Sequence, residues 1–164
     1  KYKIGEIIMN FYDSGDILTG DMIAQFENDL NLSLPSDYKS FMLKVNGGTP
    51  EDDWMFSFMD SANGELNNSD LRELFVFYNE VNDNYDDIIR IYKSMVSEKL
   101  ISPLYFPIGD DSGGNPICIN LSDDEYGAVF YCDHELEDAE TGFLLSSKIA
   151  NSFADFLELL CPLE

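Results

Sequence analysis

The chain has 164 residues, of which 32 are Asp or Glu and 9 are Lys or Arg, so its formal net charge is −23. A surface of that charge repels phosphate backbones and anionic lipid headgroups, which argues against direct binding of nucleic acid or membranes and favours cationic partners. Aromatic residues make up 13% of the chain, too many for a disordered acidic protein, and the length predicts a single domain over residues 1–164.

The first predicted element is a helix that begins after Thr19, whose side chain can accept hydrogen bonds from the free N–H groups of the first turn. Its apolar residues recur at helical spacing at Met22, Ile23, Phe26 and Leu30. A second helix is predicted to start at Pro35, and we expect the Asn-Gly-Gly sequence at 46–48 to end it. Its apolar stripe is Tyr38, Phe41, Met42 and Val45.

The middle of the chain predicts two strands and a helix. Trp54–Met59 has the composition of a strand, and the turn signal Asn63-Gly64 separates it from a second candidate, Leu71–Tyr78. A third helix is expected from about Asn84 to near Lys99. One face of this helix carries Tyr85, Ile88, Ile89, Tyr92, Met95 and Val96.

The last third of the chain is predicted to be mostly β. Leu104–Ile108 contains Pro107 and is expected to form a short or edge strand, followed by a turn at 109–114. Pro116–Leu121 and Gly127–Cys132 predict an antiparallel hairpin, which we expect in one sheet with Trp54–Met59.

Phe143–Ile149 is a further candidate strand, and Asn151 or Ser152 is expected to cap a terminal helix. That helix carries Phe153, Phe156, Leu157 and Leu160 on its apolar face. This order of elements predicts an α+β fold with a central, mainly antiparallel sheet flanked by helices.

No group of residues predicts catalysis, a cofactor or a metal site. His134 is the one histidine, and no Gly-x-Ser-x-Gly motif accompanies it, so we interpret it as a structural or surface residue at the end of a strand. Cys118 and Cys132 lie in apolar runs and are expected to be buried in a reducing cytosol, and with Cys161 they lack zinc-ligand spacing. The acidic loop at 110–115 lacks the ligand spacing of a calcium loop. The chain also lacks an apolar run of about 18 residues, and we expect a cytoplasmic protein.

The acidic residues are unevenly distributed along the chain. Between Leu100 and Ser147 there are ten Asp or Glu and no Lys or Arg. Most of the ten lie in predicted turns, so we expect them to gather along the rims of the sheet and to steer a basic partner toward it. Acidity that serves only solubility is the alternative explanation. The residues predicted to bind a partner are Asp110, Asp111, Asp123, Asp124, Glu125, Glu137 and Asp138.

Two groups of residues in this chain resemble the SUKH superfamily. The first is Leu-Pro at 34–35 with Asp-Tyr at 37–38, followed by Phe41 and the Asn-Gly-Gly sequence at 46–48. The second runs from Phe-Pro-Ile-Gly at 106–109 through Gly-Gly-Asn at 113–115 to the segment that ends in Asp-His-Glu at 133–135. The resemblance covers about Thr19 to Leu160. Cys132 occupies a place where members often have Trp, and the acidic segment Glu137–Glu140 departs from the pattern.

The resemblance implies an α+β domain with helices around a central sheet. It also implies bacterial immunity proteins, which bind and neutralise polymorphic toxins, many of them nucleases, and fungal cell-wall regulators that act through protein contacts. No catalytic residue carries over. We therefore predict an immunity protein without enzymatic activity or cofactor, whose partner is a cognate, basic toxin domain. A regulatory scaffold, and a hydrolase that uses two carboxylates, are the alternatives, and the sequence leaves the oligomeric state open.

Overall fold

The structure, a computed structural model, describes residues 1–5, 7–78 and 87–163. The described helices are α1 (Gly20–Leu30), α2 (Ser36–Met42), α3 (Ile88–Ser97) and α4 (Phe153–Leu159). The first strands are β1 (Tyr2–Ile4), β2 (Ile7–Met9), β3 (Phe11–Tyr12), β4 (Thr49–Pro50), β5 (Trp54–Met59), β6 (Leu66–Asp70) and β7 (Glu73–Leu74). The later strands are β8 (Tyr105–Asp110), β9 (Pro116–Asn120), β10 (Val129–Glu137), β11 (Leu144–Ala150) and β12 (Cys161–Pro162).

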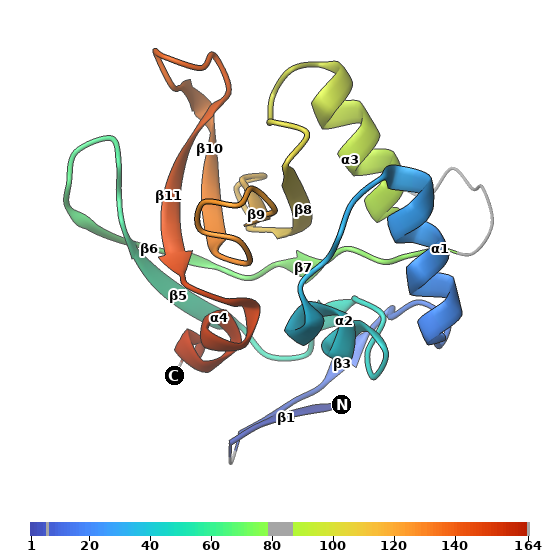
Figure 1. The fold of residues 1–164 in the computed structure, drawn as a ribbon. Helices are drawn as coiled ribbons and strands as arrows, with labels where there is room; N and C mark the ends of the chain where they lie inside the picture. Colours follow the sequence, from blue (N-terminus) through green and yellow to red (C-terminus); the bar gives the residue numbers. More distant parts are fainter. Residues whose placement is uncertain (6, 79–86, 164) are drawn as a thin grey trace.

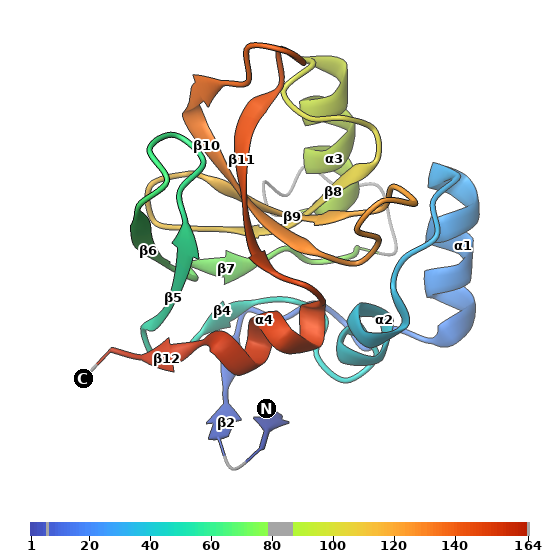
Figure 2. The same cartoon turned by 60° about the vertical axis from the view of Figure 1, so that its left-hand side comes forward.

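A five-stranded sheet with the order β11-β10-β9-β8-β7 forms the centre of the fold, and all of its strand pairs are antiparallel (Figure 1). A smaller sheet with the order β12-β5-β6 lies beside it, and Ser61 after β5 donates a backbone hydrogen bond to the hydroxyl of Ser147 on β11. Helix α3 lies along β8, while α2 and α4 lie together near the N-terminal strands (Figure 2). The predicted α+β class with antiparallel sheets is confirmed.

Local sequence signals account for several of these elements. Thr19 caps α1, because its hydroxyl accepts the N–H of Met22 at 3.2 Å. Ser152 caps α4 in the same way, through the N–H of Asp155 at 3.0 Å. The predicted hairpin is also confirmed, because β9 and β10 pair antiparallel with Phe130 opposite Cys118.

The Asn-Gly-Gly sequence at 46–48 has a role that differs from the predicted helix cap. Helix α2 already ends at Met42, so the glycines lie beyond it. The side chain of Asn46 is buried and bonds the backbone of Phe77 in both directions, at 2.8 and 2.9 Å. Gly47 has a φ of 63°, and a Cβ there would lie 2.5 Å from the carbonyl oxygen of Phe75. These residues therefore dock the chain after α2 against the segment after β7.

Three other predictions were wrong. Trp54–Met59 forms β5, which pairs with β6 and β12 instead of joining the sheet of β9 and β10. Pro107 lies in β8, an interior strand between β7 and β9, where a register shift between Pro107 and Gly109 accommodates it. Of Leu71–Tyr78, only Glu73–Leu74 forms a strand.

The predicted start of the third helix at Asn84 lies outside the described residues. The described part of this helix is α3, which Asp87 caps by accepting the N–H of Ile89 at 3.0 Å.

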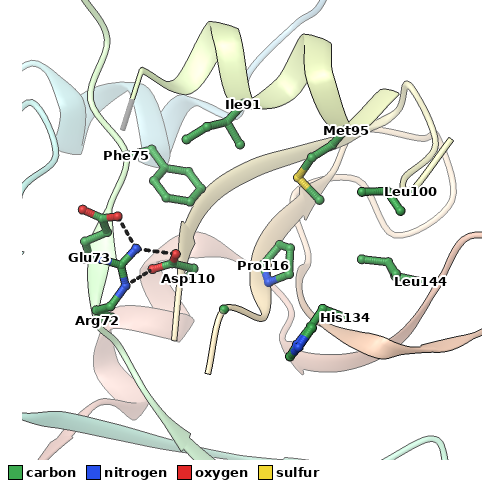
Figure 3. Close-up of a pocket in the computed structure, with 11 residues that line it drawn as sticks. Arg72, Glu73, Phe75, Ile91, Met95, Leu100, Asp110, Pro116, His134 and Leu144 are labelled. Atoms are coloured by element: carbon green, nitrogen blue, oxygen red, sulfur yellow. Dashed lines mark hydrogen bonds and ion pairs between the residues drawn. The ribbon is translucent and has the colours of Figure 1, made fainter. Parts of the chain in front are cut away.

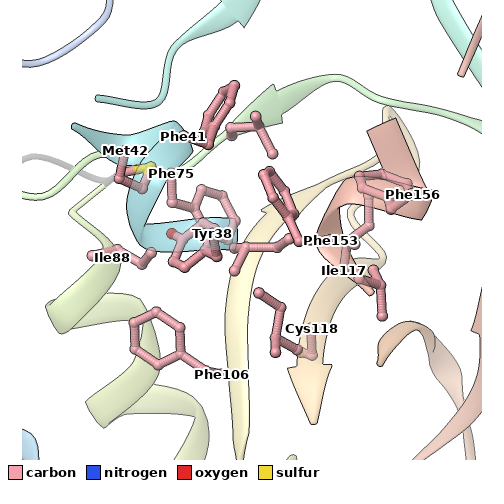
Figure 4. Packing of buried hydrophobic residues seen from close by; sticks show 14 of the residues in the cluster. Tyr38, Phe41, Met42, Phe75, Ile88, Phe106, Ile117, Cys118, Phe153 and Phe156 are labelled. Atoms are coloured by element: carbon pink, nitrogen blue, oxygen red, sulfur yellow. The ribbon is translucent and has the colours of Figure 1, made fainter. Parts of the chain in front are cut away.

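Aromatic side chains from separate elements meet in the hydrophobic core (Figure 4). Phe153 of α4 contacts both Tyr38 and Phe41 of α2, with ring centroids 5.1 and 5.2 Å apart. Phe156 packs on Phe56 of β5 at 5.6 Å, which joins the smaller sheet to the helices. Cys118 is fully buried in this core, as predicted, and Cys132 is buried with it.

Candidate functional site

Asp111, one of the predicted binding residues, lies below the surface in the loop between β8 and β9. The residue is 3% exposed, and its carboxylate accepts hydrogen bonds from the Ser69 hydroxyl at 2.6 Å and the Asn115 N–H at 2.8 Å. Burial by itself would raise the pKa of this carboxyl, but the hydrogen bonds from Ser69 and Asn115 outweigh it and hold the pKa below its ordinary value. Because Ser69 belongs to β6, Asp111 ties the two sheets together and is removed from the predicted binding surface.

Asp110, the last residue of β8, is held in an ion pair. Its carboxylate accepts the Arg72 Nε–H at 2.9 Å and an Nη–H at 2.6 Å, and the same guanidinium also contacts Glu73. The Asp110 hydrogen bond raises the pKa of Arg72 above its ordinary value. Burial nevertheless raises the pKa of Asp110 to about 6, against the opposing effect of Arg72. We interpret this as a carboxylate whose desolvation is only partly offset by its partner.

The turn between β9 and β10 presents Asp123, Asp124 and Glu125 to solvent. Glu125 contacts Lys148 at 2.6 Å, and this pair is exposed on both sides. Asp123 and Asp124 form no side-chain ion pair within the described part of the chain. The turn itself is held by Asn120, whose amide oxygen accepts both the N–H and the hydroxyl of Ser122, at 2.9 and 2.7 Å.

Glu137 and Asp138 lie at the end of the long hairpin formed by β10 and β11 (Figure 1). Glu137 is exposed. Asp138 closes the turn, because its carboxylate accepts the N–H groups of Glu140 and Thr141 at 2.9 and 3.0 Å. The backbone hydrogen bonds from Thr141 and Glu140 hold the pKa of Asp138 below its ordinary value. We name the residues 133–140 the acidic hairpin, since they include Asp133, Glu135, Glu137, Asp138 and Glu140.

The seven predicted residues are not gathered in one patch. Strands β9 and β10 run antiparallel, so the turn at 122–126 lies at one end of β9 and the loop at 111–115 lies at the other. The five residues of β9 separate these ends by about 16 Å. The acidic hairpin extends beyond the 111–115 end, because His134 already bonds Asn115 at the start of β9. Any partner that contacts all the exposed carboxylates must therefore span the sheet.

A pocket of about 680 Å³ lies between α3 and the strands at the 111–115 end (Figure 3). We name it the α3 pocket. Sequence reasoning missed it, since its walls come from segments far apart in the chain. Its apolar lining consists of Phe75, Ile91, Met95, Leu100, Pro116 and Leu144. A smaller cavity of about 300 Å³ shares Leu100 and Leu144 with it, and the backbones of these two residues are joined by a hydrogen bond of 2.9 Å.

One end of the α3 pocket is polar. Arg72, Glu73 and Asp110 line it, with dashed contacts visible in Figure 3. The side chains of Glu73 and Asp110 are only 16% and 14% exposed, while that of Arg72 is 47% exposed. Both carboxylates contact the Arg72 guanidinium, and this ion-pair cluster lies beside the apolar wall of the pocket.

His134 lines the α3 pocket and is fixed by a chain of hydrogen bonds. The Asn115 amide nitrogen donates to the Asp111 carboxylate at 3.0 Å, so the amide oxygen faces His134. That oxygen accepts the backbone N–H of His134 at 3.0 Å and lies 2.6 Å from its Nδ1, which makes Nδ1 the protonated ring nitrogen. The histidine is exposed and bonds to the same network that ties the sheets together, which agrees with the predicted structural or surface position.

Within residues 1–5, 7–78 and 87–163, no three His, Cys, Asp or Glu side chains are grouped as metal ligands would be. In the same ranges, no helix has the length and apolar character needed to cross a membrane.

The chain matches the SMI1 / KNR4 family (SUKH-1) over residues 17–159, which is most of its length. It belongs to that family. The chain is also similar to an SPbeta prophage-derived uncharacterized protein, YokK, of Bacillus subtilis (strain 168). The two are 28% identical over 166 residues, which cover 94% of this chain and 81% of the relative. The matched range includes α1 to α4, β5, and all strands of the five-stranded sheet, so the resemblance to the SUKH superfamily is confirmed across the core.

Proposed function

We propose that this protein is an immunity protein that binds a toxin domain and neutralises it without catalysing a reaction. Membership of the SMI1 / KNR4 family (SUKH-1) over residues 17–159 carries the proposal, because the resemblance to the SUKH superfamily implies bacterial immunity proteins. The Bacillus subtilis relative is described as prophage-derived, and a mobile element that encodes a toxin requires the matching immunity protein in the same cell.

The charge of the protein supports a basic toxin domain as the partner. A toxin that cleaves nucleic acid must bind a polyanion, so its active face is expected to be basic. A protein of charge −23 can occupy such a face in place of the polyanion. Exposed acidic residues at both ends of the sheet support an electrostatic approach of such a partner; they are Asp123, Asp124, Glu135, Glu137 and Glu140.

The test uses the toxin domain encoded by the neighbouring gene. The purified domain is mixed with this protein, and both complex formation and the activity of the toxin are measured. We expect a stable complex, with a dissociation constant in the nanomolar range or below, and loss of toxin activity at a stoichiometric ratio. Full toxin activity in the presence of a large excess of this protein would contradict the proposal.

A further inference from the structure

We propose that the α3 pocket receives an aromatic side chain that is carried by a basic segment of a protein partner. Where that partner is a toxin domain, the inference rests on the proposed function. The preference of the pocket for an apolar anchor beside positive charge can be tested without any toxin.

The lining of the pocket is the first argument. Six apolar residues line it (Figure 3), and four of them are only partly buried by the described chain. These four are Ile91, Met95, Leu100 and Leu144. Apolar surface left in contact with water favours association with a partner that covers it. The volume of about 680 Å³ lies within the usual range of binding pockets, so a whole aromatic side chain can enter.

The walls of the pocket are held in place by hydrogen bonds within the chain. The N–H of Leu144 donates to the carbonyl of Leu100 at 2.9 Å, and the N–H of His134 donates to the side chain of Asn115 at 3.0 Å. A pocket that is already ordered loses little conformational entropy on binding, so an anchor side chain contributes more to affinity there than on a flexible surface.

The chemistry of the walls favours an aromatic anchor over an aliphatic one. Phe75 supplies an aromatic ring to the lining, and Met95 supplies a thioether. Both groups make favourable contacts with a second aromatic ring. Tryptophan and tyrosine are also among the residues that contribute most to binding at protein interfaces.

Acidic side chains stand on both sides of the pocket. Glu137 is paired with Leu144 across the β10–β11 hairpin, and paired residues share one face of a sheet. Glu98 follows Ile91 and Met95 at spacings of seven and three residues, so it falls on the same face of α3. Both glutamates are exposed and can attract the residues that flank an anchor.

The charge around the pocket selects the partner. The segments 98–100 and 133–144 border it, and together they contain six acidic residues and one cation, Lys99. Lys93 falls on the opposite face of α3. A second copy of this chain carries a charge of −23 and is repelled from such a region, whereas a basic segment is attracted to it. We therefore expect the anchor to be flanked by Lys or Arg.

The probe is the peptide acetyl-Lys-Trp-Lys-amide, followed by methyl NMR of the full chain labelled at Ile, Leu and Met. We expect saturable shifts of the Ile91, Met95 and Leu144 methyl groups at millimolar peptide. The peptide acetyl-Lys-Ala-Lys-amide keeps the charge without the anchor, and acetyl-Glu-Trp-Glu-amide keeps the anchor with the opposite charge. We expect each of them to bind at least about tenfold more weakly at low salt.

Three results would overturn the assignment. The first is the absence of saturable shifts or their confinement to other methyl groups. The second is equal affinity for the Trp and Ala peptides, which would leave charge as the whole cause of binding. The third is equal affinity for the two Trp peptides at low salt, which would remove the basic partner.

Variants of α3 test the apolar wall. Ile91→Ala combined with Met95→Ala removes part of the wall, and we expect acetyl-Lys-Trp-Lys-amide to bind about tenfold more weakly. Ile89→Ala combined with Val96→Ala is the matched control, because these partly buried residues of the same helix do not line the pocket. Thermal unfolding establishes that both variants are folded. Equal affinities for the two variants would contradict the wall assignment.

Exposed variants test the charge at the mouth without disturbing the core. For Glu98→Gln combined with Glu137→Gln, we expect the same peptide to bind about threefold more weakly at low salt and without change at high salt. Glu51→Gln combined with Glu158→Gln is the control of equal charge, since both residues are exposed and lie near β4 and in α4. The same loss in both variants would show that only the net charge of the protein acts on the peptide.

The wall variant also separates this inference from the proposed function. If the toxin domain binds the wild-type protein and the Ile91→Ala, Met95→Ala variant with equal affinity, the pocket is wrong as a toxin contact and the immunity proposal stands. If the peptides bind as described but the toxin domain does not bind at all, the pocket assignment stands and the immunity proposal is wrong.

Discussion

The loop at 111–115 and the turn at 122–126 lie at opposite ends of β9, and they use their acidic side chains in opposite ways. In the loop, Asp111 is buried and accepts hydrogen bonds from Ser69 and Asn115. In the turn, Asp123 and Asp124 face solvent, and the amide of Asn120 holds the backbone instead. The comparison shows that a count of acidic residues does not reveal which of them are available to a partner.

The first way to test this comparison is Asp111→Ala. The substitution leaves the Ser69 hydroxyl and the Asn115 amide without their acceptor and loosens the link between β6 and the β8–β9 loop. We expect the free energy of unfolding to fall by about 2–4 kcal/mol, measured by urea denaturation. A loss below about 0.5 kcal/mol would show that the buried carboxylate does not organise the loop.

Asn120→Ala is the equivalent change in the turn. It removes the acceptor of two Ser122 hydrogen bonds and the donor to the Asp124 carbonyl. We expect a loss of about 1–2 kcal/mol in urea denaturation, since these bonds involve neutral groups at a partly exposed site. If this loss exceeded that of Asp111→Ala, the ranking of the two segments would be reversed.

The pH dependence of stability distinguishes a loop held by a carboxylate from a turn held by an amide. Because the pKa of Asp111 is lowered in the folded state, its contribution is present above the unfolded pKa of about 4 and is lost as pH falls through the folded pKa. We expect urea midpoints between pH 5 and about 2.5 to fall less in Asp111→Asn than in the wild type. The raised pKa of Asp110 has the opposite effect on stability between about pH 4 and pH 6. Because Asp110 is present in both proteins, this effect does not distinguish them. Parallel pH profiles would contradict the assigned role of Asp111.

The smallest effect is expected from Asp123→Asn combined with Asp124→Asn. Both side chains are exposed, so the free energy of unfolding should change by no more than about 0.5 kcal/mol. The free energies of unfolding of this double variant and of Asp111→Asn are compared by urea denaturation under the same conditions. A loss of about 2 kcal/mol or more would place these carboxylates in a structural role as well.

Much of the secondary structure could be predicted because its signals are local. Thr19 and Ser152 cap helices whose apolar residues follow a 3.6-residue period, and the β9–β10 hairpin has two apolar runs around a polar turn. The resemblance to the SUKH superfamily supplied the class of protein, which periodicity and charge alone do not contain.

Long-range relations could not be predicted in this way. Nothing local in Trp54–Met59 shows that it pairs with β6 and β12 instead of β9. Pro107 is typical of an edge strand, but the shifted register in β8 removes the need for its missing N–H at an interior position.

The site was predicted only in part for the same reason. Arg72 pairs with Asp110 across 38 residues, and Lys148 reaches Glu125 from outside the segment that lacks cations. The α3 pocket combines residues from β7 to β11, so no single stretch of sequence indicates it. Lys148 directly follows the segment Leu100–Ser147 that lacks cations, and a cation at that border is a signal that sequence reasoning could have used.

The association rate with the toxin domain at two salt concentrations tests most directly whether the exposed acidic surface steers a basic partner. The variant combines Asp123→Asn, Asp124→Asn and Glu125→Gln, and the wild-type protein is the reference. At low salt we predict about threefold to tenfold slower association for the variant, a weaker salt dependence and little change in dissociation. Equal association rates at low salt would contradict a steering role for the 122–126 turn. If neutralising the acidic hairpin as well left the rate unchanged, the charge of the surface would serve solubility alone.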